Sequence, residues 1–290
     1  MQKNTTRQSI AVQLAQHTCL GADAEREALA LLSFVTNKST LAQLTDDFFL
    51  TEEQSIELND LIARRLNHEP LAYLLGTAIF LGREFSVNRQ VLIPRPATEI
   101  IVEKLISDWS NRRVNITDVG TGSGCAAISC ALELPEADVT ACDISESALA
   151  TAERNAQRLG AEKRIKLVIS DLIDQCGASI FRSAPNVIFA NLPYIPSAEI
   201  TDLTPDVSSF EPHTALDGGP DGLDLFRRLF YQLSELPSSE LYIYLEALPE
   251  QLANIDQIAR SFLSVESTEI ISADSAGQSP IGLIIRCGNC

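Results

Sequence analysis

The sequence has few basic residues for its size, and it lacks a long apolar run. Its 290 residues include 22 lysines and arginines against 39 aspartates and glutamates, so the formal net charge is −17. This charge argues against a nucleic-acid partner, because lysine and arginine contacts supply most of the affinity for a phosphate backbone. No apolar run approaches the roughly 20 residues of a membrane helix. In a secretory signal, an apolar segment follows the first basic residues. No such segment follows Lys3 and Arg7. We therefore expect neither a nucleic-acid partner nor a membrane partner.

Histidine is scarce, and the cysteines form no framework. The chain has 3 histidines, far apart in the sequence, and 7 scattered cysteines. Cys287 and Cys290 form a lone C-x-x-C pair without the second pair that a four-ligand zinc site needs, so we interpret them as reduced thiols. Reduced cysteines in a chain of this length are typical of the cytoplasm. We expect a cytoplasmic, monomeric protein without a metal site.

Residues 1–72 are expected to form a small helical domain. Thr51 and Gln54 have the spacing of a capping box at the start of a helix. Apolar residues then recur at helical spacing, which predicts one buried face. These residues are Leu58, Leu61, Ile62 and Leu66.

The composition changes in residues 73–96, which we expect to form a β-hairpin linker. Short apolar runs flank a glycine-containing turn at 81–84, the pattern of two paired strands. Beyond Pro96, Thr98 is placed to cap a new helix. That helix opens the third predicted domain, residues 97–290.

From residue 114 on, predicted strands and helices alternate. Seven short apolar segments have the composition of strands: 114–119, 139–142, 165–169, 187–189, 241–245, 265–271 and 281–285. Ser145 is placed to cap the helix after the second strand, and Gly160 to end it. The alternation predicts an α/β fold with a mostly parallel, seven-stranded sheet and helices on both faces. Ligands bind such sheets beyond the carboxyl ends of the strands.

The first of these strands ends in a glycine-rich loop. Its residues are Asp118, Val119, Gly120, Thr121, Gly122, Ser123 and Gly124. Such a turn lets the backbone approach a ligand closely before a helix begins. Asp143 ends the second strand, 19 residues after Gly124, where a carboxylate can accept hydrogen bonds from both hydroxyls of a ribose. The dinucleotide pattern would have its third glycine at Cys125 instead. The glycine-rich loop and Asp143 together indicate an adenosine-containing cofactor.

Three side chains predict further contacts with that cofactor. The carboxylate of Asp118 suits a sulfonium cation better than a pyrophosphate. After the third strand, Asp171 can accept a hydrogen bond from the exocyclic amine of an adenine, and Leu172 can pack on the face of the ring. These residues favour a cationic cofactor that carries adenosine.

The fourth strand is followed by a polar and aromatic tetrapeptide, Asn191, Leu192, Pro193 and Tyr194. Asn191 Oδ1 and the Leu192 carbonyl can together accept both hydrogens of a planar amino group. Pro193 fixes the backbone, and Tyr194 offers a flat face for a planar group. Two acceptors would draw electron density onto a nitrogen that is otherwise a poor nucleophile, and would aim it at a methyl donor.

The glycine loop, Asp143 and the tetrapeptide 191–194 together resemble class I S-adenosylmethionine-dependent methyltransferases that act on planar amino groups. Three further stretches, 69–76, 91–99 and 210–223, look like the peptide chain release factor N5-glutamine methyltransferase family. The resemblance covers nearly the whole chain. It implies a seven-stranded, Rossmann-like methyltransferase sheet, preceded by a helical N-terminal domain that docks the substrate and by a β-hairpin linker.

The resemblance implies a reaction as well. A methyl group of S-adenosyl-L-methionine would pass to the side-chain amide nitrogen, N5, of the glutamine in the Gly-Gly-Gln loop of peptide chain release factors. Residues 120–124 would contact the methionine part of the cofactor, Asp143 the ribose and Leu172 the surroundings of the adenine. Asn191 would bind the target amide and also contact the cofactor beside it. Residues 192–194 would shape the substrate slot, which Thr98 and Glu99 would help to close.

The sequence leaves two alternatives open. The tetrapeptide of the family is usually Asn-Pro-Pro-Tyr, whereas Leu192 stands at its second place here. Asn-Leu-Pro-Tyr is typical of adenine-N6 dimethylases of ribosomal RNA, so a nucleic-acid (adenine N6) amino-methyltransferase is the first alternative. The family also has a glycine after the acidic end of the fifth strand, where this chain has Ala247. The second alternative is therefore a divergent cofactor-binding protein with little turnover.

Overall fold

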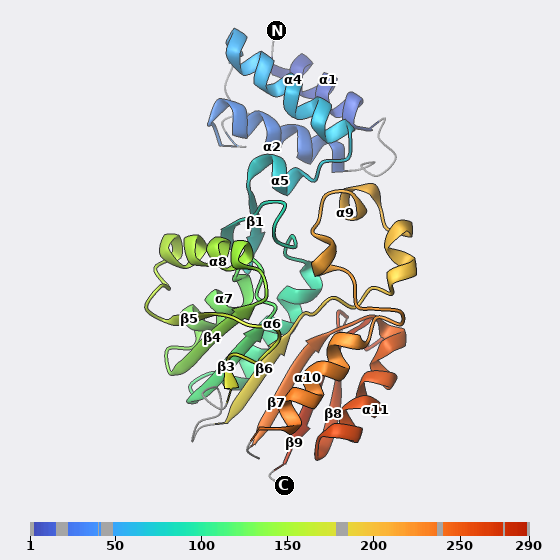
Figure 1. Cartoon of the computed structure of the whole chain (residues 1–290). Coiled ribbons are helices and arrows are strands. Elements are labelled where there is room, and N and C mark those ends of the chain that lie inside the picture. Colours follow the sequence, from blue (N-terminus) through green and yellow to red (C-terminus); the bar gives the residue numbers. More distant parts are fainter. Residues whose placement is uncertain are drawn as a thin grey trace. The chain divides into compact units, whose positions relative to one another are not determined.

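The chain divides into two compact units in the computed structural model (Figure 1). The first comprises Met1–Gly76 with Thr204–Phe210, and the second Thr77–Leu203 with Glu211–Cys290. The structure describes residues 3–15, 23–39, 41, 49–177, 185–236, 240–274 and 276–288. Cys290 lies outside these ranges, and so does the interpretation of the terminal cysteine pair. Within the described ranges, no helix has the length and apolar character to cross a membrane.

The first unit is helical. It contains α1 (Lys3–Ala15), α2 (Ala24–Thr36), α4 (Glu52–Leu66), α5 (Leu71–Leu75) and α9 (Pro205–Ser208). Its apolar core is rich in leucine and includes Leu14, Leu31, Leu32, Leu58 and Leu61. The predicted capping box is confirmed, because the Thr51 hydroxyl accepts a hydrogen bond from the Gln54 amide at 3.2 Å and the Gln54 side chain accepts one from the Thr51 amide at 3.0 Å.

A buried arginine ties three elements of this unit together. Arg65 of α4 is only 3% exposed. Its Nε donates to Glu27 of α2 at 2.8 Å, and its Nη1 donates to Asp206 of α9 at 3.4 Å. The segment 204–210 therefore belongs to the helical unit through an ion-pair cluster, although it is far from that unit in the sequence.

The second unit is built on a seven-stranded sheet, which confirms the predicted α/β fold class. The strand order is β5-β4-β3-β6-β7-β9-β8. The bounds are β3 (Val114–Val119), β4 (Ala137–Asp143), β5 (Ile165–Ile169), β6 (Asn186–Ala190), β7 (Leu241–Glu246), β8 (Val265–Ser272) and β9 (Pro280–Cys287). The strands β3 to β7 pair in parallel, whereas β9 is antiparallel to both of its neighbours. The sheet is thus mostly parallel.

Helices cover both faces of this sheet (Figure 1). They are α6 (Pro96–Trp109), α7 (Cys125–Glu133), α8 (Glu146–Leu159), α10 (Asp224–Ser234) and α11 (Leu252–Phe262). One hydrophobic core joins α6, α7 and α8 to the sheet, and a second joins α10 and α11 to it. The neighbours Phe189 and Ile188 of β6 enter the first and the second core respectively, because successive strand residues point to opposite faces.

The predicted β-hairpin is confirmed. It consists of β1 (Thr77–Phe80) and β2 (Arg83–Ser86), paired from Thr77↔Ser86 to Phe80↔Arg83. Its turn is therefore shorter than the predicted 81–84, with Leu81 and Gly82 at the tip. Phe80 and Phe85 are fully buried in the first core of the sheet.

The helix-end predictions have different outcomes. Ser145 caps α8 by accepting a hydrogen bond from the Ala148 amide at 3.2 Å, and Gly160 ends that helix with a φ of 74°. The prediction for Thr98 is wrong: α6 begins at Pro96, with Arg95 as its N-cap. Proline is favoured at the first helical position because its missing N–H would have no partner there. Thr98 is consequently inside the first turn, and its hydroxyl serves another contact.

Candidate active site

The strand order reverses at β3, which lies between β4 and β6. Ligands of parallel α/β sheets bind beyond the carboxyl ends of the strands at such a point. A cavity of about 410 Å³ opens there, within the range of roughly 300–1,000 Å³ for small-molecule sites. The cavity lining includes these predicted site residues: Asp118, Gly120, Thr121, Gly122, Ser123, Asp143, Asp171, Leu172, Asn191, Leu192 and Pro193. Gly124 and Tyr194 lie beside it without lining it.

The glycine loop requires its glycines for two different reasons. Gly120, Gly122 and Gly124 have φ values of 74°, 55° and 80°, a region that residues with a Cβ avoid. At Gly124 space is limiting as well, because a Cβ would lie 3.0 Å from Ala152 of α8. Gly124 therefore packs α8 against the start of α7, while Gly120 and Gly122 shape the cavity wall.

Asp118 is a buried carboxyl at the cavity wall. Its Oδ2 accepts hydrogen bonds from the Thr121 hydroxyl at 2.6 Å and from the Ala127 amide at 3.1 Å. Burial raises the pKa of Asp118 to about 7, and the two hydrogen bonds counteract only part of that shift. A nearby cation would favour its charged form, which is compatible with the sulfonium expected from the sequence.

Asp143 holds the glycine loop as well as lining the cavity. Its Oδ2 accepts a hydrogen bond from the Gly122 amide and its Oδ1 one from the Ser145 amide, both at 2.9 Å. Burial raises the pKa of Asp143, and these backbone bonds oppose the rise. A carboxylate oxygen can accept two hydrogen bonds, so both oxygens retain capacity for ribose hydroxyls.

The predicted adenine end of the cavity contains an ion pair. Asp171 Oδ2 accepts a hydrogen bond from Arg228 of α10 at 2.6 Å, and both residues line the cavity. Leu172 is buried with a positive φ of 55°. Its carbonyl accepts a hydrogen bond from the Cys142 thiol at 3.2 Å, so the unusual backbone conformation is held by the end of β4.

Asn191 follows β6 directly, and its amide is part of a chain of side chains. Its Nδ2 donates to the Thr98 hydroxyl at 3.0 Å, which in turn donates to Glu246 Oε2 at 2.6 Å. The Tyr194 hydroxyl donates to the other oxygen, Oε1, at 3.1 Å. Burial raises the pKa of Tyr194, and the neighbouring Glu246 carboxylate adds to the shift. Tyr194 is therefore a neutral hydrogen-bond donor rather than a base.

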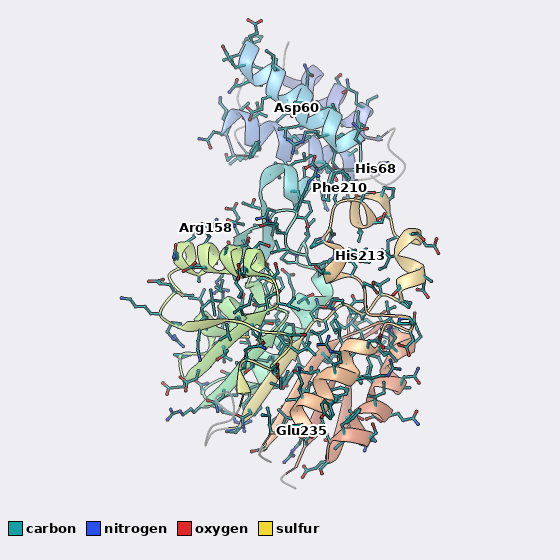
Figure 2. The ribbon with its side chains drawn as sticks, in the orientation of Figure 1. Asp60, His68, Arg158, Phe210, His213 and Glu235 are labelled. Carbon is teal, nitrogen blue, oxygen red and sulfur yellow. The ribbon has the colours of Figure 1, made fainter. Side chains whose placement is uncertain are left out.

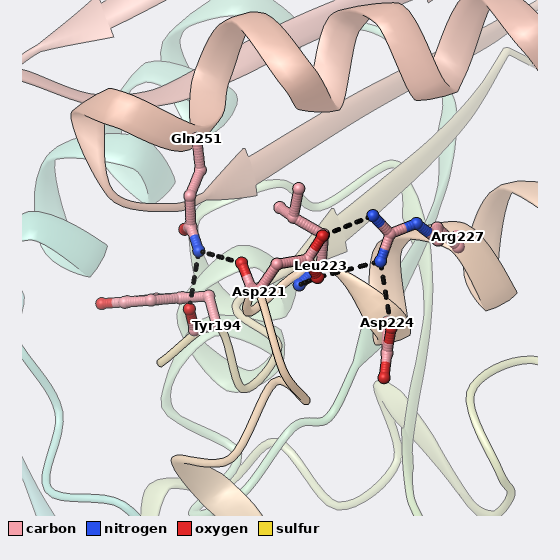
Figure 3. Close-up of polar contacts among 6 residues, drawn as sticks. All are labelled: Tyr194, Asp221, Leu223, Asp224, Arg227 and Gln251. Atoms are coloured by element: carbon pink, nitrogen blue, oxygen red, sulfur yellow. Dashed lines mark hydrogen bonds and ion pairs between the residues drawn. The ribbon is translucent and has the colours of Figure 1, made fainter. Parts of the chain in front are cut away.

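The backbone of the tetrapeptide is held at the Tyr194 carbonyl (Figure 3). Gln251 Nε2 donates to the Tyr194 carbonyl at 2.8 Å and to the Asp221 carbonyl at 3.3 Å. Gly222 passes so close to the Tyr194 carbonyl that a side chain at this position would clash with it. The ion pairs of Arg227 with Asp221 and Asp224 fix the same turn. The turn at 218–222 therefore lies directly against the backbone of the tetrapeptide.

Several cavity residues were missed by sequence reasoning. They include Gln90, Leu92, Ser145, His213 and Arg228, of which His213 is labelled in Figure 2. Leu92 and His213 lie in stretches that already carried the family resemblance, so a signal for them was present. No sequence signal pointed to Arg228, because nothing in the sequence distinguishes it from the adjacent Arg227 on the same helix. Glu99 does not line the cavity; its carboxylate accepts a hydrogen bond from the Leu81 amide of the hairpin turn at 2.8 Å.

Two known protein families match this chain, one in its helical N-terminal region and one in its sheet-containing region. The family model described as the PrmC N-terminal domain matches residues 7–76, and the model described as the methyltransferase small domain matches residues 95–202. The fold and the glycine loop at the strand reversal, together with the second match, define an α/β methyltransferase. The catalytic domain of hMettl16, solved in complex with a MAT2A 3′UTR hairpin, has a similar fold, with a TM-score of 0.54 and 14% identity over 89% of this chain and 90% of that one.

Similarity to known proteins shows which methyltransferase family the chain belongs to. The release factor glutamine methyltransferase of Thermodesulfovibrio yellowstonii is 35% identical over 81% of this chain and 83% of its own length. That of Moorella thermoacetica is 34% identical over 97% of this chain and 99% of its length. The protein of the same name from Geobacter sulfurreducens is 43% identical, but the match spans 61% of this chain and 60% of that protein. The chain belongs to the release factor glutamine methyltransferase family.

Proposed function

We propose that this chain transfers a methyl group from S-adenosyl-L-methionine to the side-chain amide nitrogen, N5, of the glutamine in the Gly-Gly-Gln loop of peptide chain release factors. The observation that carries the proposal is the position of Asn191. Its amide nitrogen is engaged by Thr98 at 3.0 Å, so the acceptor Oδ1 is the atom left for a substrate. With the Leu192 carbonyl, it would accept both hydrogens of a planar carboxamide.

The residues of the cavity fit S-adenosyl-L-methionine. A buried acidic group, Asp118, suits its positive charge, Asp143 has acceptor capacity for the ribose hydroxyls, and Leu172 offers an apolar surface to the adenine. Residues 120–124 would lie along its methionine part. When bound, this cofactor supplies an electrophilic methyl group on sulfur.

The chain's own residues would then act by positioning rather than by strong base catalysis. Asn191 and the Leu192 carbonyl orient the target nitrogen and draw electron density onto it. Pro193 lacks an N–H and fixes the backbone that presents this carbonyl. Tyr194, whose hydroxyl donates to Glu246, holds the loop in place. The proton lost by the nitrogen on methylation would pass to water.

A second candidate is methylation of an adenine N6 in nucleic acid. The Asn-Leu-Pro-Tyr sequence favours it, because the same pair of acceptors can hold the exocyclic amine of a base. The net charge of −17 disfavours it. The fold similarity to hMettl16, at 14% identity, concerns the fold alone.

The deciding experiment offers both substrate classes to the enzyme at once. Purified protein is incubated with methyl-labelled S-adenosylmethionine, a panel of release factors and ribosomal RNA, and the products are mapped by mass spectrometry. We expect label on the glutamine of the Gly-Gly-Gln loop and none when that glutamine is changed to glutamate. Label in RNA would favour the second candidate. Cofactor binding without any label would favour a binding protein with little turnover.

A further inference from the structure

We propose that Glu246 is a positioning residue that acts through Thr98 and Tyr194 and makes Asn191 present its carbonyl oxygen, rather than its NH₂ group, to the target amide. This inference rests on the proposed function and adds to it the residue that sets the polarity of the substrate site.

Glu246 brings three separate segments together at the cavity. It is the last residue of β7, only 3% exposed, and each of its carboxylate oxygens accepts one hydroxyl. The Thr98 hydroxyl, from the first turn of α6, lies 2.6 Å from Oε2, and the Tyr194 hydroxyl lies 3.1 Å from Oε1. Thr98 is itself only 4% exposed. Water competes little with these bonds, so the direction of each one is set by the partners.

Those directions follow from what each group can donate. An ionised carboxylate only accepts hydrogen bonds, so the hydrogens of Thr98 and Tyr194 must both point at Glu246. The Thr98 oxygen then has only lone pairs to offer Asn191. Asn191 must meet it with its NH₂ group, and the amide is thereby turned so that Oδ1 is the atom available to a substrate.

Replacing the carboxylate by an amide would remove this constraint. In a Glu246→Gln protein, the remaining side-chain oxygen can still accept the hydrogen bond from the Tyr194 hydroxyl, and the new NH₂ group then donates to the Thr98 oxygen. The Thr98 hydroxyl then donates its hydrogen to Asn191. Asn191 can accept this hydrogen bond only if its side-chain amide rotates so that Oδ1 faces Thr98. The NH₂ group of Asn191 would face the NH₂ group of the target amide, and two donors cannot pair. The shape of the site is almost unchanged, and only its polarity is reversed.

A neighbouring cation supports the ionised form of Glu246. Burial raises the pKa of Glu246, while the hydrogen bonds from Thr98 and Tyr194 and the charge of Arg95 lower it. Arg95 is itself paired with the buried carboxylate of Glu211. The net direction is a raised pKa, and these three groups oppose the effect of burial by favouring the charged form of Glu246.

The first test compares Glu246→Gln and Thr98→Val with Thr98→Ser as the matched control. Serine retains the hydroxyl, whereas valine replaces it by a methyl group of similar size. We expect kcat/KM for release factor methylation to fall on the order of 100-fold in Glu246→Gln and Thr98→Val, the loss associated with one misplaced polar partner of a reacting group. Thr98→Ser should remain within a few-fold of the wild type. Affinity for S-adenosylmethionine, measured calorimetrically, should change little in all three, which distinguishes a positioning role from a general loss of structure.

The second test uses the sign of an interaction between two substitutions. Asn191→Asp presents an acceptor to the substrate whichever way the side chain is turned. In the wild-type background it places a second carboxylate on Thr98, which has only one hydrogen to share, and activity should fall sharply. In the Glu246→Gln background Thr98 is free to donate to Asp, so the same substitution should raise kcat/KM at least several-fold above Glu246→Gln alone.

The outcomes separate the two proposals. If the wild-type chain methylates no release factor, the proposed function fails. If it does methylate one and Glu246→Gln retains its kcat/KM, the role of Glu246 is refuted. The role is equally refuted if Asn191→Asp harms both backgrounds alike, because a packing contribution of Glu246 gives no reversal of sign.

Discussion

The carboxylate of Asp143 accepts a hydrogen bond from the backbone amide of Gly122 at 2.9 Å. The residue expected to hold a ribose therefore also holds the loop expected to hold the methionine part of the cofactor. Two halves of one binding site depend on the same side chain.

Removal of this carboxylate should weaken cofactor binding more than the loss of ribose contacts alone. Asp143→Ala leaves the Gly122 and Ser145 amides without their acceptor, and a hydrogen bond to a charged group contributes about 1.5–3 kcal/mol. We expect the affinity for S-adenosylmethionine, measured by isothermal titration calorimetry, to fall at least about tenfold. Asp256→Ala is the control, because that carboxylate pairs with Arg260 on α11 and does not line the cavity, so the affinity of this variant should match that of the wild type. Equal affinities of the Asp143→Ala and wild-type proteins would contradict the shared role.

Gly124 should tolerate substitution less well than a glycine of similar backbone conformation. Gly124 and Gly160 have φ values of 80° and 74°, but only at Gly124 would a Cβ meet neighbours, 3.0 Å from both Ala152 and Ile128. The left-handed backbone conformation costs an alanine roughly 1–2 kcal/mol at either site. Crowding in a packed core adds about 1–3 kcal/mol at Gly124 alone. Urea unfolding should therefore show a larger loss of stability for Gly124→Ala than for Gly160→Ala, and similar losses would refute the packing role.

The sequence predicted the sheet and the cavity better than it predicted how side chains within them are paired. Alternating apolar segments and terminal glycines are local signals, and they placed residues 118–124, Asp143 and Asn191 at one end of the sheet. The contact of Glu246 with Thr98 joins residues 148 positions apart. No local pattern reveals such a pair. The local pattern predicts a helix cap at Thr98, whereas the preference for proline at the first helical position starts the helix at Pro96.

The same reason explains Arg65. On the sequence it is one of two adjacent arginines late in a helix, where basic residues are favourable on the surface. In the structure Arg64 is partly exposed, whereas the Arg65 side chain is 4% exposed and reaches Asp206, 141 positions away. Helical spacing places Arg65, and not Arg64, on the face of Leu58, Leu61 and Ile62, but only the tertiary fold supplies the acidic partners of a buried arginine.

The Arg65 cluster predicts a strong and specific effect on stability. Arg65→Met removes the partner of two carboxylates, Glu27 and Asp206, which are 12% and 23% exposed. Breaking a buried ion pair costs about 3–5 kcal/mol when a charge is left without its partner. Arg26→Met is the matched control, because Arg26 and its partner Asp23 are 87% and 67% exposed and such surface pairs contribute little. Thermal unfolding should show a markedly lower Tm for Arg65→Met only; equal Tm values for the two variants would show that the cluster does not stabilise the unit.

The titration of Asp118 predicts how stability and cofactor binding change with pH. Burial raises its pKa from 3.8 to about 7, so the folded chain holds this proton at pH values where the unfolded chain has released it. The stabilisation from this group is therefore complete below about pH 4 and is lost as the pH rises through 7. A cationic ligand favours the charged carboxylate, so binding of S-adenosylmethionine at pH 6 should release a proton and its affinity should rise between pH 6 and pH 8. Calorimetry in buffers of different ionisation enthalpy measures that proton directly. Asp118→Asn should bind more weakly with no proton release from this site, and parallel pH profiles for the two proteins would assign the titration to another group.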